Sequence, residues 1–165
     1  ISAQTAEGVT ILSETVLHRK MFGALAAIQI SADCISLQVT GSNDDPHVLR
    51  TGIRIKGMDL HGTSLIVWNG RKCEVYSVST GSTRSGISQE PQQVGSFPTR
   101  SRACAVHNDN IFCAVGSRVE VCNFQGTVKT ALSFTETEGQ PVHIDSNDKF
   151  LAVVTTTGEC CCCCC

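Results

Sequence analysis

The chain has 165 residues, of which 41% are hydrophobic and 17% are charged, and its formal net charge is −2. That is enough apolar material for one domain core. The near-neutral charge predicts no basic face for binding phosphates, which excludes a dedicated nucleic-acid role. No apolar run approaches the roughly 20 residues that span a bilayer, so we expect no direct membrane insertion. We expect the partners of this chain to be proteins.

Short apolar runs separated by turn residues follow one another along the chain. Val, Ile and Thr are common in these runs, and the connecting segments are rich in Gly, Asn and Asp, which favour tight turns. No segment beyond the first thirty residues shows a sustained helical period, so the pattern predicts an all-β fold. In chain order, the predicted strands are residues 9–12, 25–30, 35–39, 65–68, 74–78, 111–115, 119–124 and 150–154.

An internal repeat indicates the architecture. Residues 58–70 align without gaps on residues 104–116, an offset of 46 residues, and a third copy begins at Pro141. Each copy predicts a strand, a polar turn, a strand, a glycine turn and a strand, at the period of a four-stranded propeller blade. The predicted fold is therefore a partial WD40-like β-propeller of antiparallel four-stranded blades, about three to four in number.

Such a short array has consequences for its ends. Propellers usually close with four to eight blades, so we expect this array not to close alone and to leave two apolar blade faces in water. The sequence starts without a methionine and runs directly into the predicted strand at residues 9–12, so we also expect it to be a piece of a longer protein.

The cysteines divide into two groups. Six of the 11 form the run at residues 160–165, which we expect to lie outside a propeller domain at residues 1–159. Adjacent thiolates can bind Zn or Cu(I), but six contiguous cysteines cannot all converge on one tetrahedral ion, so we predict no metal site there. The other five lie in apolar segments and predict free thiols in a reducing cytosol. These are Cys34, Cys73, Cys104, Cys113 and Cys122.

Four segments of this sequence resemble the intraflagellar transport protein 140 family. They are residues 11–14, 67–71, 125–129 and 132–139, and the similarity extends over residues 9–154. The resemblance implies a subunit of the intraflagellar transport A complex that acts in retrograde ciliary transport and cilium assembly. Its partners would be other subunits of that complex and ciliary cargo proteins, in the cilium, at the ciliary base and in the cytoplasm.

The repeats depart from the usual WD pattern. The Trp-Asp pair expected at the end of the third strand is replaced by Tyr76-Ser77 in one copy and by Cys122-Asn123 in the next. The histidine of the usual Gly-His pair is also unmatched, because His61 and His107 follow the first strand rather than precede it. The hydrogen-bond network that rigidifies many WD blades should therefore be missing.

The repeated histidines His61, His107 and His143 could be considered as a metal site, because neutral imidazoles are common ligands. Equivalent residues of successive blades should instead lie on a wide ring around the propeller axis, and each histidine sits in a turn-like stretch. We therefore interpret them as turn residues and predict no metal ion and no other cofactor.

A polar loop is the main candidate for partner contact. Residues 81–86 lack the Gly-Lys-Ser/Thr ending of a phosphate loop, and no helix is predicted to follow them. The stretch continues through residues 89–93 and is the most polar part of the chain. Its candidate contact residues are Arg84, Gln89 and Glu90, and a solvated linker is the alternative interpretation.

No catalytic constellation is visible, so an enzyme is not predicted. The chain contains no nucleophile-elbow or zinc-helix motif, and Asp44, Asp45 and the aspartates at 145 and 148 are interpreted as turn formers. Trp68, Val75 and Val121 are expected to serve packing between blades. Two function classes remain, which are a non-enzymatic assembly subunit and a propeller that binds a peptide or small ligand outside the cilium.

Overall fold

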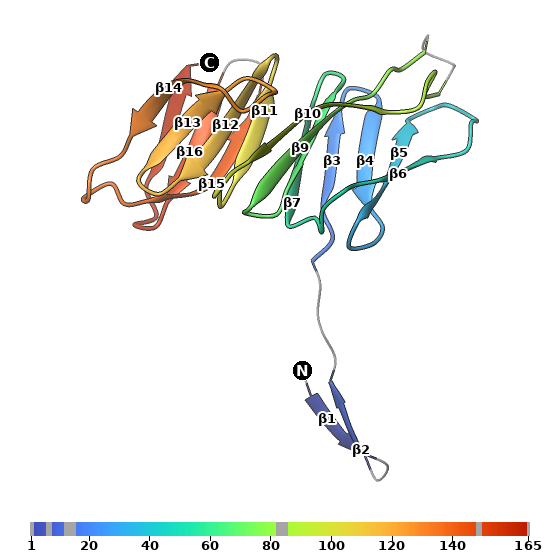
Figure 1. Cartoon of the computed structure of the whole chain (residues 1–165), viewed down its shortest axis with the longest axis horizontal. Helices are drawn as coiled ribbons and strands as arrows, with labels where there is room; N and C mark the ends of the chain where they lie inside the picture. Colours follow the sequence, from blue (N-terminus) through green and yellow to red (C-terminus); the bar gives the residue numbers. More distant parts are fainter. Residues whose placement is uncertain (1, 6–7, 12–15, 82–85, 148–149, 165) are drawn as a thin grey trace.

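Four antiparallel sheets follow one another in this computed structural model, which describes residues 2–5, 8–11, 16–81, 86–147 and 150–164. Figure 1 shows them side by side, with a separate hairpin of β1 (Ser2–Thr5) and β2 (Gly8–Ile11) standing away from them. Within each sheet, the hydrogen-bonded neighbours are also neighbours in sequence. The described residues contain no helix that is long and apolar enough to cross a bilayer.

The sheets are the four blades of a β-propeller, as the sequence predicted. Blade 1 contains β3 (Arg19–Phe22), β4 (Leu25–Gln29), β5 (Cys34–Val39) and β6 (His47–Arg50). Blade 2 contains β7 (Gly57–His61), β8 (Ser64–Trp68), β9 (Lys72–Ser77) and β10 (Gln92–Pro98). Blade 3 contains β11 (Cys104–His107), β12 (Asn110–Val115), β13 (Arg118–Cys122) and β14 (Val128–Ser133). Blade 4 contains β15 (Pro141–Ser146), β16 (Phe150–Thr155) and β17 (Cys160–Cys164).

The internal repeat is confirmed at the level of strand register. Met58 pairs with Val67 in blade 2, and the residues 46 positions later, Cys104 and Cys113, pair in the same way in blade 3. The first turns match as well. Gly62 has a φ of 58°, and its counterpart Asn108 has a φ of 50°. Asparagine tolerates this left-handed conformation better than other non-glycine residues, so the turn survives the substitution.

The outermost strands of the first three blades were not predicted. In β14 all six residues are exposed, so the strand carries no buried face that would give an alternating pattern. Strand β10 begins at Gln92 and Gln93, which the sequence interpretation had placed in the polar loop. That interpretation is wrong for these two residues. These strands form through backbone pairing to β9 and β13, which needs no apolar side chain.

The run of cysteines also differs from expectation. Cys160–Cys164 form β17, which pairs with β16 from Phe150↔Cys164 to Val154↔Cys160. The predicted domain boundary after residue 159 therefore cuts through blade 4 in this structure. Backbone N–H and C=O groups make this ladder whatever side chains the residues carry.

The hydrophobic core consists of three clusters, one between each pair of successive blades. Leu37 and Leu65 belong to the cluster between blades 1 and 2, and Ile66 and Val106 to the one between blades 2 and 3. Ala105 and Leu151 belong to the cluster between blades 3 and 4. No fourth cluster joins blade 4 to blade 1 among the described residues, and their terminal faces carry exposed apolar side chains. These are Met21, Ile28, Val48 and Phe150.

The core cysteines are free thiols, as expected. Cys73, Cys104 and Cys113 are buried between blades 2 and 3. The sulfur atoms of Cys104 and Cys113 lie 3.8 Å apart, whereas a disulfide bond is about 2.05 Å long. Burial, and then the neighbouring thiols, raise the pKa of Cys104 well above its usual value, so this thiol stays protonated at neutral pH.

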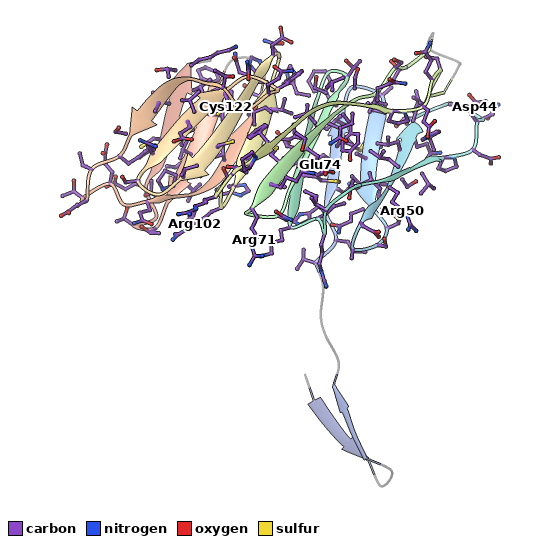
Figure 2. All side chains as sticks on the ribbon, in the orientation of Figure 1. Asp44, Arg50, Arg71, Glu74, Arg102 and Cys122 are labelled. Carbon is purple, nitrogen blue, oxygen red and sulfur yellow. The ribbon has the colours of Figure 1, made fainter. Side chains whose placement is uncertain are left out.

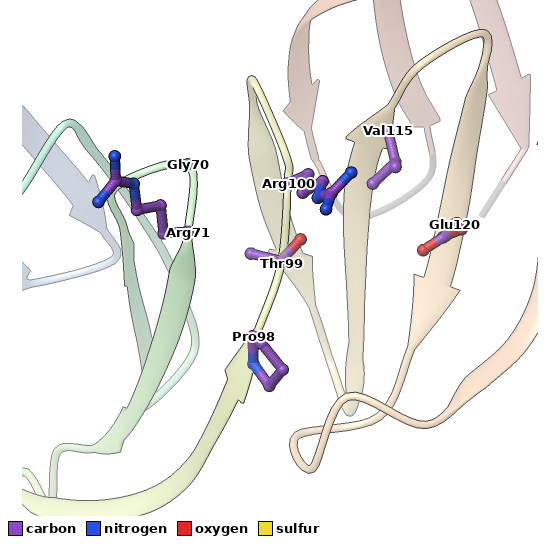
Figure 3. Close-up of a pocket in the computed structure, with 7 residues that line it drawn as sticks. All are labelled: Gly70, Arg71, Pro98, Thr99, Arg100, Val115 and Glu120. Atoms are coloured by element: carbon purple, nitrogen blue, oxygen red, sulfur yellow. The ribbon is translucent and has the colours of Figure 1, made fainter.

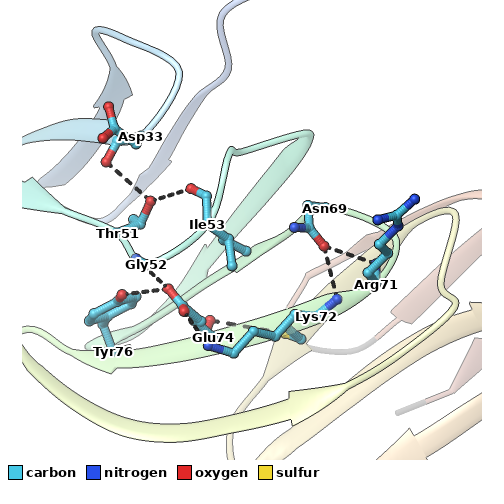
Figure 4. A network of polar contacts seen from close by, with 10 residues as sticks. Asp33, Thr51, Gly52, Ile53, Asn69, Arg71, Lys72, Glu74 and Tyr76 are labelled. Atoms are coloured by element: carbon cyan, nitrogen blue, oxygen red, sulfur yellow. Dashed lines mark hydrogen bonds and ion pairs between the residues drawn. The ribbon is translucent and has the colours of Figure 1, made fainter.

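A buried carboxylate joins blade 2 to the loop that enters it (Figure 4). Glu74 is 1% exposed and accepts hydrogen bonds from the Gly52 backbone N–H at 2.9 Å, the Lys72 ammonium at 2.8 Å and the Tyr76 hydroxyl at 2.7 Å. Burial opposes the charged form of Glu74, but these donors outweigh it and hold its pKa below the usual value. Burial and the carboxylate together raise the pKa of Tyr76, which therefore remains a donor.

Trp68 generates a first prediction, about stability. Its indole is buried between blades 2 and 3 and covers Gly57, where an added Cβ would collide with the ring. Trp68→Ala should lower the free energy of unfolding by about 3–5 kcal/mol, and Gly57→Ala by about 1–3 kcal/mol. Urea denaturation measures both. Val128→Ala, on exposed β14, is the control and should cost less than about 0.5 kcal/mol. If Trp68→Ala lowered the free energy of unfolding as little as the control Val128→Ala does, the buried packing of the indole would be contradicted.

Glu74 generates a second prediction, about pH. Because folding lowers the pKa of Glu74, its charge stabilises the fold at neutral pH, and this contribution is lost as the pH falls through the folded-state pKa. Glu74→Gln should cost about 1.5–3 kcal/mol at pH 7, and the difference from the unsubstituted chain should shrink below about pH 4. Denaturant unfolding at both pH values tests this, with Glu90→Gln on the exposed loop as the control. A deficit that grows on acidification would refute it.

Candidate functional site

The innermost strands of the four blades, β3, β7, β11 and β15, line the propeller axis. In β3, β7 and β11, the last residue before the first turn pairs with the first residue of the next strand, as in Phe22↔Leu25 and His61↔Ser64. These pairs define equivalent positions around the axis. The equivalent residues are Phe22, His61 and His107, and Ser146 of β15 lies one position earlier, in register with Leu60 and Val106.

Lys20 is the charged centre of this axial site. Its ammonium nitrogen lies 3.0 Å from an Asp59 oxygen and 3.0 Å from an Asp145 oxygen, which joins blade 1 to blades 2 and 4. Burial opposes the charge on Lys20, but the two carboxylates outweigh it and raise its pKa above the usual value. Burial raises the pKa of Asp59, and Lys20 and the Val106 N–H, 2.9 Å away, offset this only in part.

A row of aromatic rings lies at one end of the same strands. The ring centres of Phe22 and His61 are 4.4 Å apart, and those of His61 and His107 are 4.5 Å apart. The Asn108 backbone N–H donates to Nδ1 of His61 at 3.2 Å. The expectation of a wide ring of separate histidines is therefore wrong for His61 and His107, because neighbouring inner strands bring them into contact.

His143 does not join this row. It pairs with Val154 and is exposed, while Ser146 holds the position equivalent to Val106. The Ser146 hydroxyl donates to the Val106 carbonyl oxygen at 3.1 Å. No group of three or more metal-ligating side chains is arranged to hold an ion in the part of the chain that the structure describes.

The axial site opens into a cavity of about 420 Å³. The Lys20 ammonium lines this cavity, but it already forms ion pairs with Asp59 and Asp145. One ammonium shared by two carboxylates lies beside rings in tilted and edge-on contact, an arrangement that suits joining blades at the axis. The cavity lining includes Lys20, Phe22, Asp59, His61, Asp145 and Asn147.

The polar loop between β9 and β10 is only partly described. Gln89 and Glu90 are exposed, whereas Arg84 lies outside the described residues. The loop is tied to the turn between β5 and β6, because the Gly86 N–H donates to the Asp44 carboxylate at 2.6 Å. Asp44 is thus a contact between two loops as well as a turn residue.

The three predicted packing residues lie in two of the core clusters. Trp68 and Val75 belong to the cluster between blades 2 and 3, and Val121 to the one between blades 3 and 4. The sequence interpretation missed Lys20 and Asp59. A signal for Asp59 was available, because it interrupts the apolar residues Met58 and Leu60 in a strand, where a charge needs a partner.

Solved propellers with little sequence similarity share this fold. The computationally designed Ika4 protein has a TM-score of 0.60 and 8% identity, and the match covers 92% of each chain. Hsv2 from Kluyvelomyces marxianus has a TM-score of 0.54 and 12% identity over 95% of this chain and 52% of its own. KlHsv2 with loop 6CD replaced by a Gly-Ser linker has a TM-score of 0.55 and 10% identity, and the match covers 86% of this chain and 46% of that one. The chain thus spans about half the length of the Hsv2 chains.

A family model matches most of the chain. Its description is IFT140 second beta-propeller, and it matches residues 23–160. The match begins at the first turn of blade 1 and extends through the 46-residue repeat to the first residue of β17. It confirms the resemblance noted in the sequence, and the chain belongs to the family of the second β-propeller of IFT140.

Proposed function

We propose that this chain is a non-enzymatic assembly module of an intraflagellar transport A complex component. It acts in retrograde ciliary transport and cilium assembly through protein-protein contacts. The family match over residues 23–160 is the observation that supports this proposal. Its partners are other subunits of the same complex and ciliary cargo proteins, and its locations are the cilium, the ciliary base and the cytoplasm.

The geometry is compatible with an assembly role. The ionisable groups at the axis are engaged with one another, and the loops at both ends of the blades are exposed. Rigid blades that display exposed loops are a common basis for protein contacts. The other function class, a propeller that binds a small ligand or peptide outside the cilium, would use the axial cavity, where a ligand must compete with the two carboxylates for Lys20.

The polar loop generates a third prediction. Replacing Arg84, Gln89 and Glu90 together by alanine should leave the abundance of the parent protein unchanged, because exposed loop substitutions usually change stability by less than about 0.5 kcal/mol. If the loop contacts a partner, retrograde movement should fail in ciliated cells that lack the parent and express this variant. Live imaging of cilia and immunoblotting measure the two outcomes.

Trp68→Ala is the comparison for that assay. It should reduce abundance, and transport should fail in proportion, since its effect is on folding. Normal abundance together with failed transport for Trp68→Ala would contradict a packing role. A pull-down of the parent from ciliated cells should recover other transport A subunits in stoichiometric amounts, and their absence would count against the assembly proposal.

A further inference from the structure

Three loops at one end of the blades concentrate positive charge. Residues 51–56 join β6 to β7, residues 69–71 join β8 to β9, and residues 99–103 join β10 to β11. These loops contain no aspartate or glutamate. Their cationic side chains, which we call the basic rim, are Arg54, Lys56, Arg71, Arg100 and Arg102.

The charges of the basic rim are unpaired. All five side chains are exposed, and none forms an ion pair within the described part of the chain. The nearby cations Lys72 and Arg118 are different, because Glu74 and Glu120 hold them at 2.8 and 2.6 Å. Five uncompensated charges on neighbouring loops create a positive potential that attracts an anionic partner.

The described loops at the opposite end of the blades carry no lysine or arginine. Their acidic residues are Asp44, Asp45, Glu90 and Asp109. Figure 2 shows Arg71 and Arg102 along the lower edge of the blades and Asp44 at their right-hand end, above the level of these arginines. Asp33, Glu136, Glu138 and Glu159 lie in other loops at the same end as the rim, so the positive charge is local to the three rim loops. A net charge of −2 therefore conceals a local cluster of five cations, and the expectation that the chain has no basic face differs from the structure.

Hydrogen bonds fix the loops of the rim against one another. The Lys56 N–H donates to the Trp68 carbonyl at 2.9 Å, and the Thr99 N–H donates to the Arg71 carbonyl at 2.9 Å. The Arg102 N–H donates to the Ala114 carbonyl at 3.0 Å. The backbone that carries the five cations is thus held in place before any partner binds, which lowers the entropic cost of binding.

A cavity with apolar walls lies within the rim. Its volume is about 400 Å³, and Figure 3 shows Arg71 and Arg100 at this cavity with Pro98 and Val115. Glu120, paired with Arg118, forms part of the lining. A second, smaller cavity has Lys56, Trp68 and Arg102 in its lining. Apolar hollows therefore alternate with cations along the rim.

We propose that the basic rim is a docking surface for an acidic peptide segment of a partner protein. Glutamate or aspartate side chains of the peptide pair with Arg71, Arg100 and the other rim cations. An apolar side chain of the peptide enters the hollow between Pro98 and Val115. The inference depends on charge and shape, and it holds whether or not the chain acts in ciliary transport.

A peptide fits these features better than a membrane or a nucleic acid. A hollow with apolar walls accepts a single side chain, which a flat sheet of lipid headgroups does not offer. The described residues of the three loops contain no Phe, Tyr or Trp on which a base could stack. Carboxylates match the planar fork of arginine, four of which are in the rim.

Fluorescence anisotropy with defined probes tests the proposal on the 165-residue chain. The probe is a labelled glutamate-rich peptide with a central leucine. It should bind, and its affinity should fall steeply as salt is raised to about 0.5 M. Arg71→Glu with Arg100→Glu should weaken binding about tenfold or more. The control Lys129→Glu reverses one charge on exposed β14, as each rim substitution does, and should bind like the unsubstituted chain. Circular dichroism verifies that each variant is folded.

Other probes define what would overturn the proposal. These are the same peptide with serine for leucine, a lysine-rich version, phosphatidylserine vesicles and a single-stranded oligonucleotide. The serine peptide should bind several-fold more weakly, and the other three should bind less well than the glutamate peptide. Equal binding of the serine peptide, tighter binding of vesicles or oligonucleotide, or full affinity in the Arg71 and Arg100 double variant would each refute it.

Discussion

The contact between the faces of successive blades is the interaction on which this structure depends. A single three- or four-stranded sheet cannot bury both of its faces, and each blade here gains a partner only from the blade before or after it. Leu65 and Ile66 show this division, because these adjacent residues of β8 point to opposite faces and belong to different clusters. Stability should therefore be transmitted from blade to blade, and loss of one cluster weakens both sheets that share it.

Polar contacts add geometric definition to this apolar packing. Lys20 reaches carboxylates from two other blades, and Asp59 also accepts the N–H of Val106 from a third. Such groups are costly to bury unless all are paired, so they favour one angular arrangement of the blades over alternatives. Glu74 has the same role further from the axis, where it fixes the loop that leads from blade 1 into blade 2. These contacts are the local substitute for the Trp-Asp network that the repeats lack.

The sequence allowed the inner part of each blade to be predicted more fully than the outer part. Strands such as Ser64–Trp68 and Asn110–Val115 are buried on both sides, so apolar runs and the 46-residue offset reveal them. Val128–Ser133 is exposed along its whole length and is held by its backbone, so no side-chain pattern marks it. The axial contact of Lys20 with Asp145 joins residues 125 positions apart, and only the three-dimensional structure brings them together.

The same reasoning explains why the charged surface was not visible in the composition. Arg54, Arg71 and Arg102 lie in three separate loops, and no single loop holds more than two of the five cations. In an antiparallel blade, alternate turns emerge at the same end, so the loops after β6, β8 and β10 must meet there. The fold therefore brings together cationic side chains that are far apart in the sequence. Because the blades bury their apolar faces against each other, their loop ends are the surfaces left for recognition, and a cluster of five cations on three neighbouring loops gives the module a defined orientation toward an acidic partner.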